Sequence, residues 1–209
     1  MAATKPDLRR EAGLRTQRRL MEATLDLLAE RGEGGVTLRA VTAAADANVA
    51  AVSYHFGSLG ALCDAAIEQA LERYLEAQQA AVSEVSSDAT IEQLAAAFAG
   101  PMISAISAGG RELSVLRIVA RAAIDPPPGW DRLGASFDRV RADALRVLKA
   151  RLPGVPRREL IFRSRCAAGL LNWLVLAPVG AELRGKGTKQ IERALVPVVS
   201  GVLRGGSSG

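Results

Sequence analysis

The sequence predicts an all-α protein of about nine helices, with three short N-terminal helices in one domain and a second, larger all-helical domain behind them. Three observations predict this class. Alanine, leucine, arginine and glutamate dominate the composition, and these residues favour helix. Apolar residues recur at spacings of three and four. Glycine and proline clusters divide these stretches, and no segment has the pattern of a strand.

Length and composition limit the class of protein. The 209 residues suffice for one large or two small domains, and 49% hydrophobic residues can supply a sizeable core. No apolar run reaches the roughly 18 residues of a membrane span, and the charged N-terminus is unlike a signal peptide. Cys63 and Cys166 lie in apolar helical contexts and are predicted to be buried, reduced thiols. We therefore expect a cytoplasmic protein without a membrane partner.

The first residues of the chain are basic. The net charge is +5, and residues 5–19 hold six cations against two acids. Residues 1–14 are predicted to be a disordered basic arm. Such an arm either lies along phosphates or is a solvated terminus, and its composition suits both.

Residues 15–60 are predicted to form the first domain. A helix over 15–31 ends at Gly32, a loop follows, and two short helices cover 38–45 and 49–55. Thr37 and Asn48 can cap the two short helices. Asp46 lies between them, where the chain must turn. Aspartate tolerates the left-handed conformation that such a turn requires. Two capped helices joined by a tight turn are typical of a helix-turn-helix, whose second helix enters a DNA major groove. Alanine-rich helical hairpins without a DNA role share the pattern.

The remaining helices follow from periodicity and from breaks. Ser58 can cap a long helix over 59–85, and a proline run after Asp125 marks a loop. Pro101 is expected to kink or divide its helix, and Pro197 to interrupt the last one. Residues 205–209 are predicted to be a flexible tail. The other predicted helices cover 90–108, 112–124, 130–151, 157–181 and 188–204.

The chain resembles the TetR family of bacterial transcriptional regulators. The matching pieces are LMEATL at 20–25, Gly32, TLRAV at 37–41, VSYHFGS at 52–58 and Leu62. The resemblance implies a dimer that binds double-stranded DNA through the first domain and a small-molecule effector through the second, at 61–204. It also implies a dimer interface built from the helices near 157–181 and 188–204.

The expected DNA-binding residues come from the motif and from the resemblance. Tyr54 matches a family position whose hydroxyl reaches a phosphate. Thr37 and Arg39 open a helix, where N–H groups favour a phosphate. His55 either donates to a phosphate or packs against the scaffold. The predicted set is Arg15, Arg18, Thr37, Arg39, Asn48, Val49, Ala51, Ser53, Tyr54 and His55, with bases read by Asn48, Ser53 and the apolar Val49 or Ala51.

Several positions depart from the family pattern. Asp46 stands in place of the usual turn glycine, and Ala47 in place of a bulky apolar residue. Leu59 replaces a lysine that normally touches phosphate, and the recognition helix at 49–55 has no arginine or lysine. These departures favour an alternative in which the protein is an interaction or ligand-binding module with weak or lost DNA binding.

The second domain is expected to enclose a pocket with apolar walls and few polar anchors, and therefore to take a mostly apolar effector. Arg117 and Arg121 are spaced to meet an anion together. The sequence has no glycine-rich phosphate loop and no metal-ligand spacing, so no cofactor, metal or catalytic residue is predicted. An all-helical enzyme or carrier is a further alternative. The predicted pocket residues are Phe98, Met102, Leu116, Arg117, Val119, Arg121, Trp130, Phe137, Leu170, Asn172 and Trp173.

Overall fold

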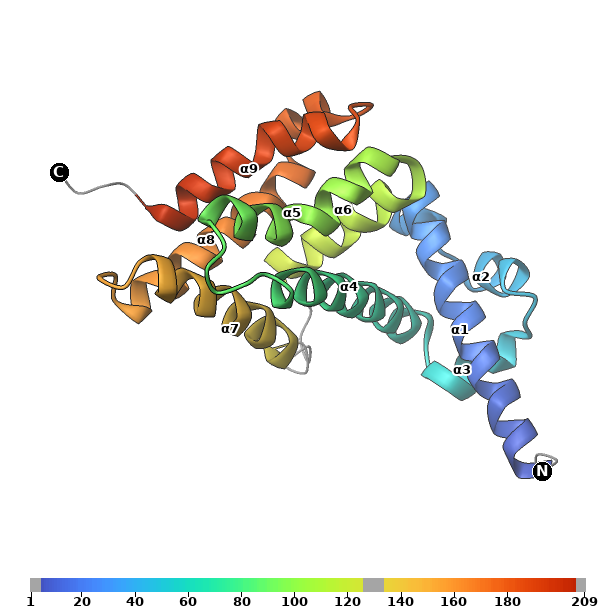
Figure 1. The fold of residues 1–209 in the computed structure, drawn as a ribbon. Helices are drawn as coiled ribbons and strands as arrows, with labels where there is room; N and C mark the ends of the chain where they lie inside the picture. The colour runs from blue at the N-terminus through green and yellow to red at the C-terminus, as the bar shows by residue number, and fades with distance from the viewer. Residues whose placement is uncertain (1–4, 126–133, 206–209) are drawn as a thin grey trace. The chain divides into compact units, whose positions relative to one another are not determined.

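The computed structural model describes residues 5–125 and 134–205, and all regular structure in these ranges is helical (Figure 1). The predicted all-α class is therefore confirmed. Two 3-10 helices occur in the described ranges, η1 (Glu33–Gly35) and η3 (Pro178–Leu183). The nine α-helices found there are α1 (Lys5–Arg31), α2 (Leu38–Ala44), α3 (Val49–Phe56), α4 (Leu59–Ser83), α5 (Ile91–Ala108), α6 (Gly110–Ile124), α7 (Gly134–Arg151), α8 (Arg157–Leu176) and α9 (Thr188–Arg204).

The chain divides into two compact units, Met1–Ala70 and Leu71–Gly209, and α4 begins in the first and ends in the second. In the first unit, α1, α2, α3 and the start of α4 share one core. Its buried members recur at helical spacing because each helix turns one apolar stripe inward. They are Leu20, Ala23, Leu27, Val41, Ala45, Val52 and Leu62.

Side-chain caps fix where the short helices begin. The Ala40 N–H donates to Thr37 Oγ1 at 3.2 Å, and the Ala50 N–H donates to Asn48 Oδ1 at 3.0 Å. Ser58 Oγ accepts from the Ala61 N–H at 3.1 Å at the start of α4. The three predicted caps are confirmed, and each satisfies an N–H that would otherwise have no partner in the first turn.

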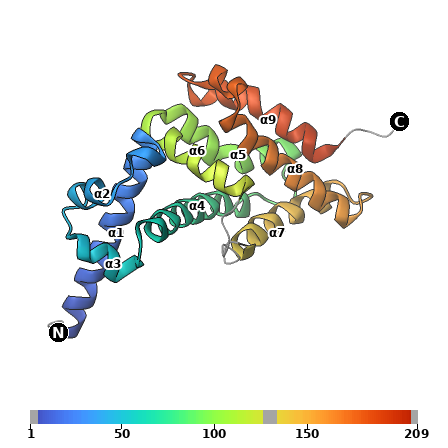
Figure 2. The same cartoon turned by 180° about the vertical axis from the view of Figure 1, so that it is seen from behind.

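The second unit is a bundle in which α5 lies along α9 and α8 packs against α6, α7 and α9 (Figure 2). The largest fully buried side chains of this unit come from five helices. They are Leu71, Leu94, Met102, Ile103, Leu148, Leu160, Leu171, Ile191 and Leu203. Helix α5 is the core helix of the bundle.

Helix α5 is also long and apolar enough to cross a membrane, judged by length and composition alone. This differs from the expectation that no apolar run reaches the length of a membrane span, because α5 reaches the threshold only as an average over its 18 residues. In the bundle 44% of these residues are buried, with leucine, isoleucine and phenylalanine packed inside. A buried core helix passes the same test, so the finding is weak evidence for a membrane span.

The N-terminal arm differs from its prediction. Helix α1 begins at Lys5, so the segment expected to be disordered is helical over the part that the structure describes. Arginine, glutamate, alanine and leucine dominate residues 5–14, and their helix propensity extends the following helix toward the N-terminus. Residues 1–4 lie outside the described residues.

Two prolines do not break their helices. Pro101 lies inside a continuous α5, and Pro197 lies inside a continuous α9. Each is flanked by buried residues, Phe98 and Met102 around the first and Leu195 and Val199 around the second. Core packing on both sides keeps the helix together although proline removes one backbone hydrogen bond.

Helix α8 ends at Leu176 rather than near residue 181, because the chain turns extended at Ala177 before Pro178. Helix α9 begins at Thr188, and Gly187 is its N-cap residue. The predicted burial of the two cysteines is wrong as well. Neither forms a disulfide in the described ranges, but Cys63 is half-buried and Cys166 is exposed.

Candidate functional site

Helix α3 consists of four rows of residues spaced i, i+4, and the rows differ in exposure. Val52 and Phe56 form the row that packs on the core, where Val52 is 1% exposed. The opposite rows are open: Val49 is 46% and Tyr54 85% exposed. The helix is therefore held by one side and presents the other, which is the geometry of a rod that can enter a groove.

The turn before α3 contains a strained residue. Asp46 has a φ of +46°, the one non-glycine left-handed residue in the described ranges. The Ala47 N–H donates to the Thr42 carbonyl at 3.0 Å, which closes the turn. Arg19 Nη1 lies 3.6 Å from Asp46 Oδ2, but both side chains are solvated, so this ion pair adds little. The predicted left-handed turn at Asp46 is confirmed.

We expect Asp46→Ala to lower the free energy of unfolding by about 1 kcal/mol, because alanine tolerates the left-handed conformation less well than aspartate. Asp46→Gly is the matched control and should cost nothing, since glycine adopts a positive φ freely. Urea denaturation followed by circular dichroism measures both. Equal stability of the alanine and glycine variants would contradict this account of the turn.

Most of the predicted DNA-binding residues lie on the surface of the first unit. The exposed ones are Arg15, Arg18, Thr37, Arg39, Asn48, Val49, Ser53 and Tyr54. Two others are half-buried. Ala51 packs against the core, and Ala50 faces outward in its place. The sequence contains a signal for the difference between Ala50 and Ala51, because Ala51 is next to Val52, which belongs to the row of α3 that packs on the core.

His55 is also half-buried and lies between neighbours. Its ring meets Tyr54 edge-on at 4.9 Å between centroids. Gly13 of α1 passes so close that a Cβ there would stand 3.6 Å from His55 Cε1. These contacts favour the packing role over the phosphate role that the sequence left open for His55.

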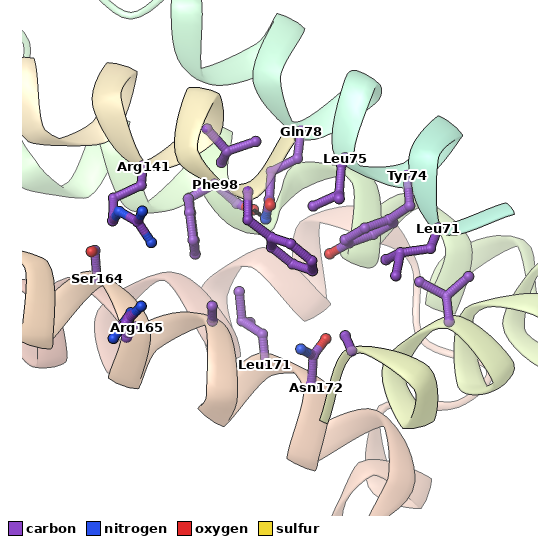
Figure 3. A pocket seen from close by; sticks show the side chains of 15 residues that line it. Leu71, Tyr74, Leu75, Gln78, Phe98, Arg141, Ser164, Arg165, Leu171 and Asn172 are labelled. Atoms are coloured by element: carbon purple, nitrogen blue, oxygen red, sulfur yellow. Dashed lines mark hydrogen bonds between the residues drawn. The ribbon is translucent and has the colours of Figure 1, made fainter. Parts of the chain in front are cut away.

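The second unit contains a cavity between helices, lined mostly by apolar side chains (Figure 3). One face of α4 supplies a wall at spacings of three and four. The lining residues are Leu71, Tyr74, Leu75 and Gln78 from α4, Phe98 from α5, Val119 and Ala123 from α6, Phe137, Val140 and Arg141 from α7, and Ser164, Arg165, Ala168, Leu171 and Asn172 from α8.

The predicted pocket residues divide between this cavity and other places. Phe98, Val119, Phe137 and Asn172 line it, whereas Arg117, Arg121, Met102, Leu116, Leu170 and Trp173 do not. Met102 and Leu116 are buried in the core, and Trp173 is 54% exposed on α8. Trp130 lies outside the described residues. The sequence did not predict the cavity residues of α4, because their spacing is that of ordinary core residues. It also did not predict the two arginines of the lining, because they have the sequence context of solvated surface residues.

Two polar side chains of α4 face the cavity. Gln78 is buried, and its Nε2 donates to the Phe98 carbonyl at 2.7 Å, which fixes α4 to α5. The Tyr74 hydroxyl points toward the interior of the cavity (Figure 3). Burial raises the pKa of Tyr74, so the phenol stays neutral and can donate or accept one hydrogen bond.

Arg117 and Arg121 do not form the predicted anion pair at the cavity. Arg117 Nε is buried without a hydrogen-bond partner in the described part of the chain. Its pKa is lowered by desolvation and then by the nearby Arg184 guanidinium. Arg121 is exposed on α6.

Two arginines of α7 attach the C-terminal end of α4. Arg139 Nε donates to Gln79 Oε1 at 3.1 Å, and Arg146 Nη2 donates to the Val85 carbonyl at 2.8 Å. Arg146 also reaches the Ser83 carbonyl at 3.4 Å. A cation beside the last carbonyls of a helix is favourable, so this end of α4 is held by α7.

Helix α8 exposes a stripe with apolar ends. Phe162 is 66% and Trp173 54% exposed, and Cys166 and Gly169 lie exposed between them at helical spacing. Val198 of α9 is 49% exposed. Exposed aromatic side chains along one face of a helix are a feature that interaction surfaces share.

The fold and these surfaces define an all-helical DNA-binding transcription regulator with a helix-turn-helix unit and an effector domain. Residues 20–66 match the family described as bacterial regulatory proteins of the tetR family, and residues 96–200 match the tetracyclin repressor-like C-terminal domain. The chain belongs to the TetR family of transcriptional regulators. Regulators of this family are not enzymes, so the alternative of an enzyme falls away.

Individual relatives agree with this assignment. The chain is 32% identical over 79 residues to the probable HTH-type transcriptional regulator YttP of Bacillus subtilis, a match that spans 38% of each protein. A transcriptional regulator from Rhodococcus sp. Rha1 superposes with a TM-score of 0.63 at 22% identity, over 90% of this chain and 96% of that one. The TetR family regulator PfmR from Thermus thermophilus gives 0.60 at 17%, over 90% and 98%. These two structures support the fold alone.

Proposed function

We propose that this regulator is a homodimeric repressor that binds a palindromic operator and is released by a small, mostly apolar effector. We further propose that it acts in the cytoplasm, with residues 15–60 as the DNA-binding domain and residues 61–204 as the effector and dimerisation domain. The observation that carries the proposal is the open side of α3, where Tyr54 is 85% exposed while Val52 on the opposite side is buried.

The exposed residues divide by the chemistry that they offer. Arg15, Arg18, Arg39, Thr37 and Tyr54 suit phosphate contacts, which position the protein without reading sequence. Asn48 and Ser53 can hydrogen-bond to base edges, and Val49 with the outward-facing Ala50 can touch thymine methyl groups. Ala51 has no such role, because it packs inward. The few base readers predict modest discrimination per base, with two half-sites supplying the rest.

We expect Arg39→Ala to weaken binding to all DNA sequences alike and to lower the slope of log affinity against log salt by about one, the effect of losing one phosphate contact. Tyr54→Phe removes one hydroxyl donor and should add to the loss without changing the preferred sequence. Fluorescence anisotropy on the upstream DNA of the protein's own gene, over a range of salt concentrations, measures both quantities.

Arg193→Ala is the control, because this exposed arginine of α9 lies in the second unit. A second candidate function, an interaction module with lost DNA binding, is favoured by the absence of arginine and lysine from α3 and by Leu59, which is half-buried against the core. If neither the unaltered protein nor the variants form a salt-sensitive, sequence-dependent complex, the second candidate stands and the repressor proposal fails.

The exposed stripe of α8 supports the proposed dimer. A second copy of the chain is the occupant that we propose for Phe162, Trp173 and the small Gly169 between them, together with Val198 of α9. Two helices from each protomer would then bury these side chains, and the twofold axis of the dimer matches the symmetry of a palindrome.

The wall that α4 contributes to the cavity supports the proposed release. A ligand between α4 and the facing helices presses on Leu71, Leu75 and Tyr74, and α4 continues into the first unit as one helix. The ligand shifts DNA affinity only as far as it binds one position of α4 better than the other. Two recognition helices at a changed spacing no longer fit both half-sites, so the affinity falls.

A further inference from the structure

The cavity has two chemically different ends. The guanidinium groups of Arg141 from α7 and Arg165 from α8 lie at one end, whereas Leu71 and Tyr74 of α4 lie at the other (Figure 3). Phe98 lies between them (Figure 3). A molecule that fills the whole cavity therefore meets cations at one end and an apolar wall along its body.

The charge at the cationic end is not balanced within the cavity. Among the described lining residues there are two arginines and no carboxylate. Arg141 forms an ion pair with Asp138, one helical turn earlier on α7. Arg165 is exposed to solvent, borders the cavity, and has no ion-pair partner in the described ranges. The hydroxyl of its neighbour Ser164 already donates to the Ile161 carbonyl at 2.8 Å. The N–H groups of Arg165 are therefore available to an anion that enters this end of the cavity, and such a charge-assisted hydrogen bond is stronger than a neutral one.

The dimensions suit a molecule of medium length. Arg165 and Asn172 lie seven residues apart on α8, which is about 10 Å along the helix axis. The cavity volume is about 80 Å³. One water occupies about 10–15 Å³ of such a cavity volume, so the cavity can hold roughly six waters. Six waters take up about 180 Å³ in liquid water. A chain of about eight carbons with one polar head has a comparable bulk.

We propose that the effector is a medium-chain monocarboxylic acid, with its carboxylate bound by Arg165 and secondarily by Arg141 and its apolar body along Phe98 toward Tyr74. The inference rests on the effector role of the cavity in the proposed function. One guanidinium without a partner and one shared with Asp138 balance a single negative charge better than the double charge of a phosphate ester.

The test is calorimetric titration of the full-length protein with four probes that share one chain: octanoate, octan-1-ol, octylamine and octyl phosphate. We expect octanoate to bind about ten- to a hundredfold more tightly than octanol, the margin that one charge-assisted hydrogen-bonded contact supports. Octylamine should not bind measurably, and octyl phosphate should bind more weakly than octanoate.

Two matched variants locate the carboxylate. Arg165→Met keeps the length of the side chain and removes its charge, so octanoate should lose its margin while octanol is unchanged. Arg158→Met is the control, because Arg158 is exposed on the same side of α8, seven residues earlier, and does not line the cavity. Circular dichroism of both variants shows whether each remains folded, and unchanged octanol binding shows that the cavity is intact.

The ligand class is overturned if octanol equals octanoate, if octyl phosphate binds more tightly, or if Arg165→Met leaves octanoate binding unchanged. DNA binding in the presence of the same probes separates this inference from the proposed function. If octan-1-ol releases DNA and octanoate does not bind, the carboxylic-acid effector is rejected and the proposed effector-controlled release of DNA is retained. If octanoate binds through Arg165 but DNA affinity does not change, the carboxylic-acid ligand is retained and the proposed effector-controlled release of DNA is rejected.

Discussion

Replacing Leu62 by alanine is expected to unfold the first unit at physiological temperature and to abolish DNA binding. Leu62 is fully buried in the core of α1, α2 and α3, and the half-buried Leu59 is the other residue that α4 packs against this core. Truncating a buried leucine costs about 2–5 kcal/mol, because the lost burial is accompanied by a cavity that the neighbours fill only partly. At about 0.05–0.15 kcal/mol per residue, a unit the size of Met1–Ala70 is stable by about 4–10 kcal/mol, so the loss is comparable to the whole stability of the unit. Thermal denaturation followed by circular dichroism measures the loss.

Leu14→Ala is the matched control, since the same truncation is made at a leucine of α1 that is 52% exposed. It should change the free energy of unfolding by less than about 0.5 kcal/mol. The second unit has its own core, so part of the helical signal of Leu62→Ala should melt at the temperature of the unaltered protein. A single unshifted transition for Leu62→Ala would show that Leu62 does not hold the first unit together.

The double variant Phe162→Lys and Trp173→Lys is expected to convert the proposed dimer into a monomer. Both aromatic side chains are more than half exposed in one chain, so the monomer loses little stability. In the proposed dimer both lysines would be buried in the interface, and burying charges without partners is costly. Sedimentation equilibrium should give the chain mass of 21.9 kDa for the variant and twice that mass for the unaltered protein.

Loss of the dimer also removes the linkage between two half-sites, so operator affinity should fall on the order of 10²–10⁴-fold while binding to a single half-site is unchanged. Ile124→Lys is the control, because Ile124 is 54% exposed on α6 and outside the stripe. A variant that stays dimeric with Phe162 and Trp173 both replaced would place the interface elsewhere on the molecule.

The helix-turn-helix was predictable because its signals are local. Thr37, Asn48 and Ser58 each cap the helix that directly follows, and Asp46 needs only its own backbone conformation to close the turn. Ala51 was misplaced for a different reason. The exposure of a residue depends on which neighbouring helix covers it. When only the helix itself is predicted, its packing partners are not known, so its half-buried row cannot be identified.

The cavity was less predictable because it depends on contacts between distant segments. Leu71 and Leu75 have the spacing of ordinary core, and only the arrangement of five helices leaves space beside them. Arg141 and Arg165 resemble surface cations in sequence, and Arg165 is exposed although it also borders the cavity, because long side chains can lie along apolar surface while the charge stays in water. Pro101 illustrates the same limit, because tertiary packing keeps α5 continuous against the local preference.

The attachment of α4 to α7 by Arg139 and Arg146 gives the helix a fixed end and therefore the properties of a lever. From Gln79, which Arg139 holds, to Leu59 at the start of α4 the helix runs twenty residues, or about 30 Å. A rotation of about 5° about the held end would carry the free end about 2.6 Å sideways over that length. If α4 moves as one body, as the proposed release requires, a displacement of less than an ångström beside Leu75 becomes a displacement several times larger at Leu59.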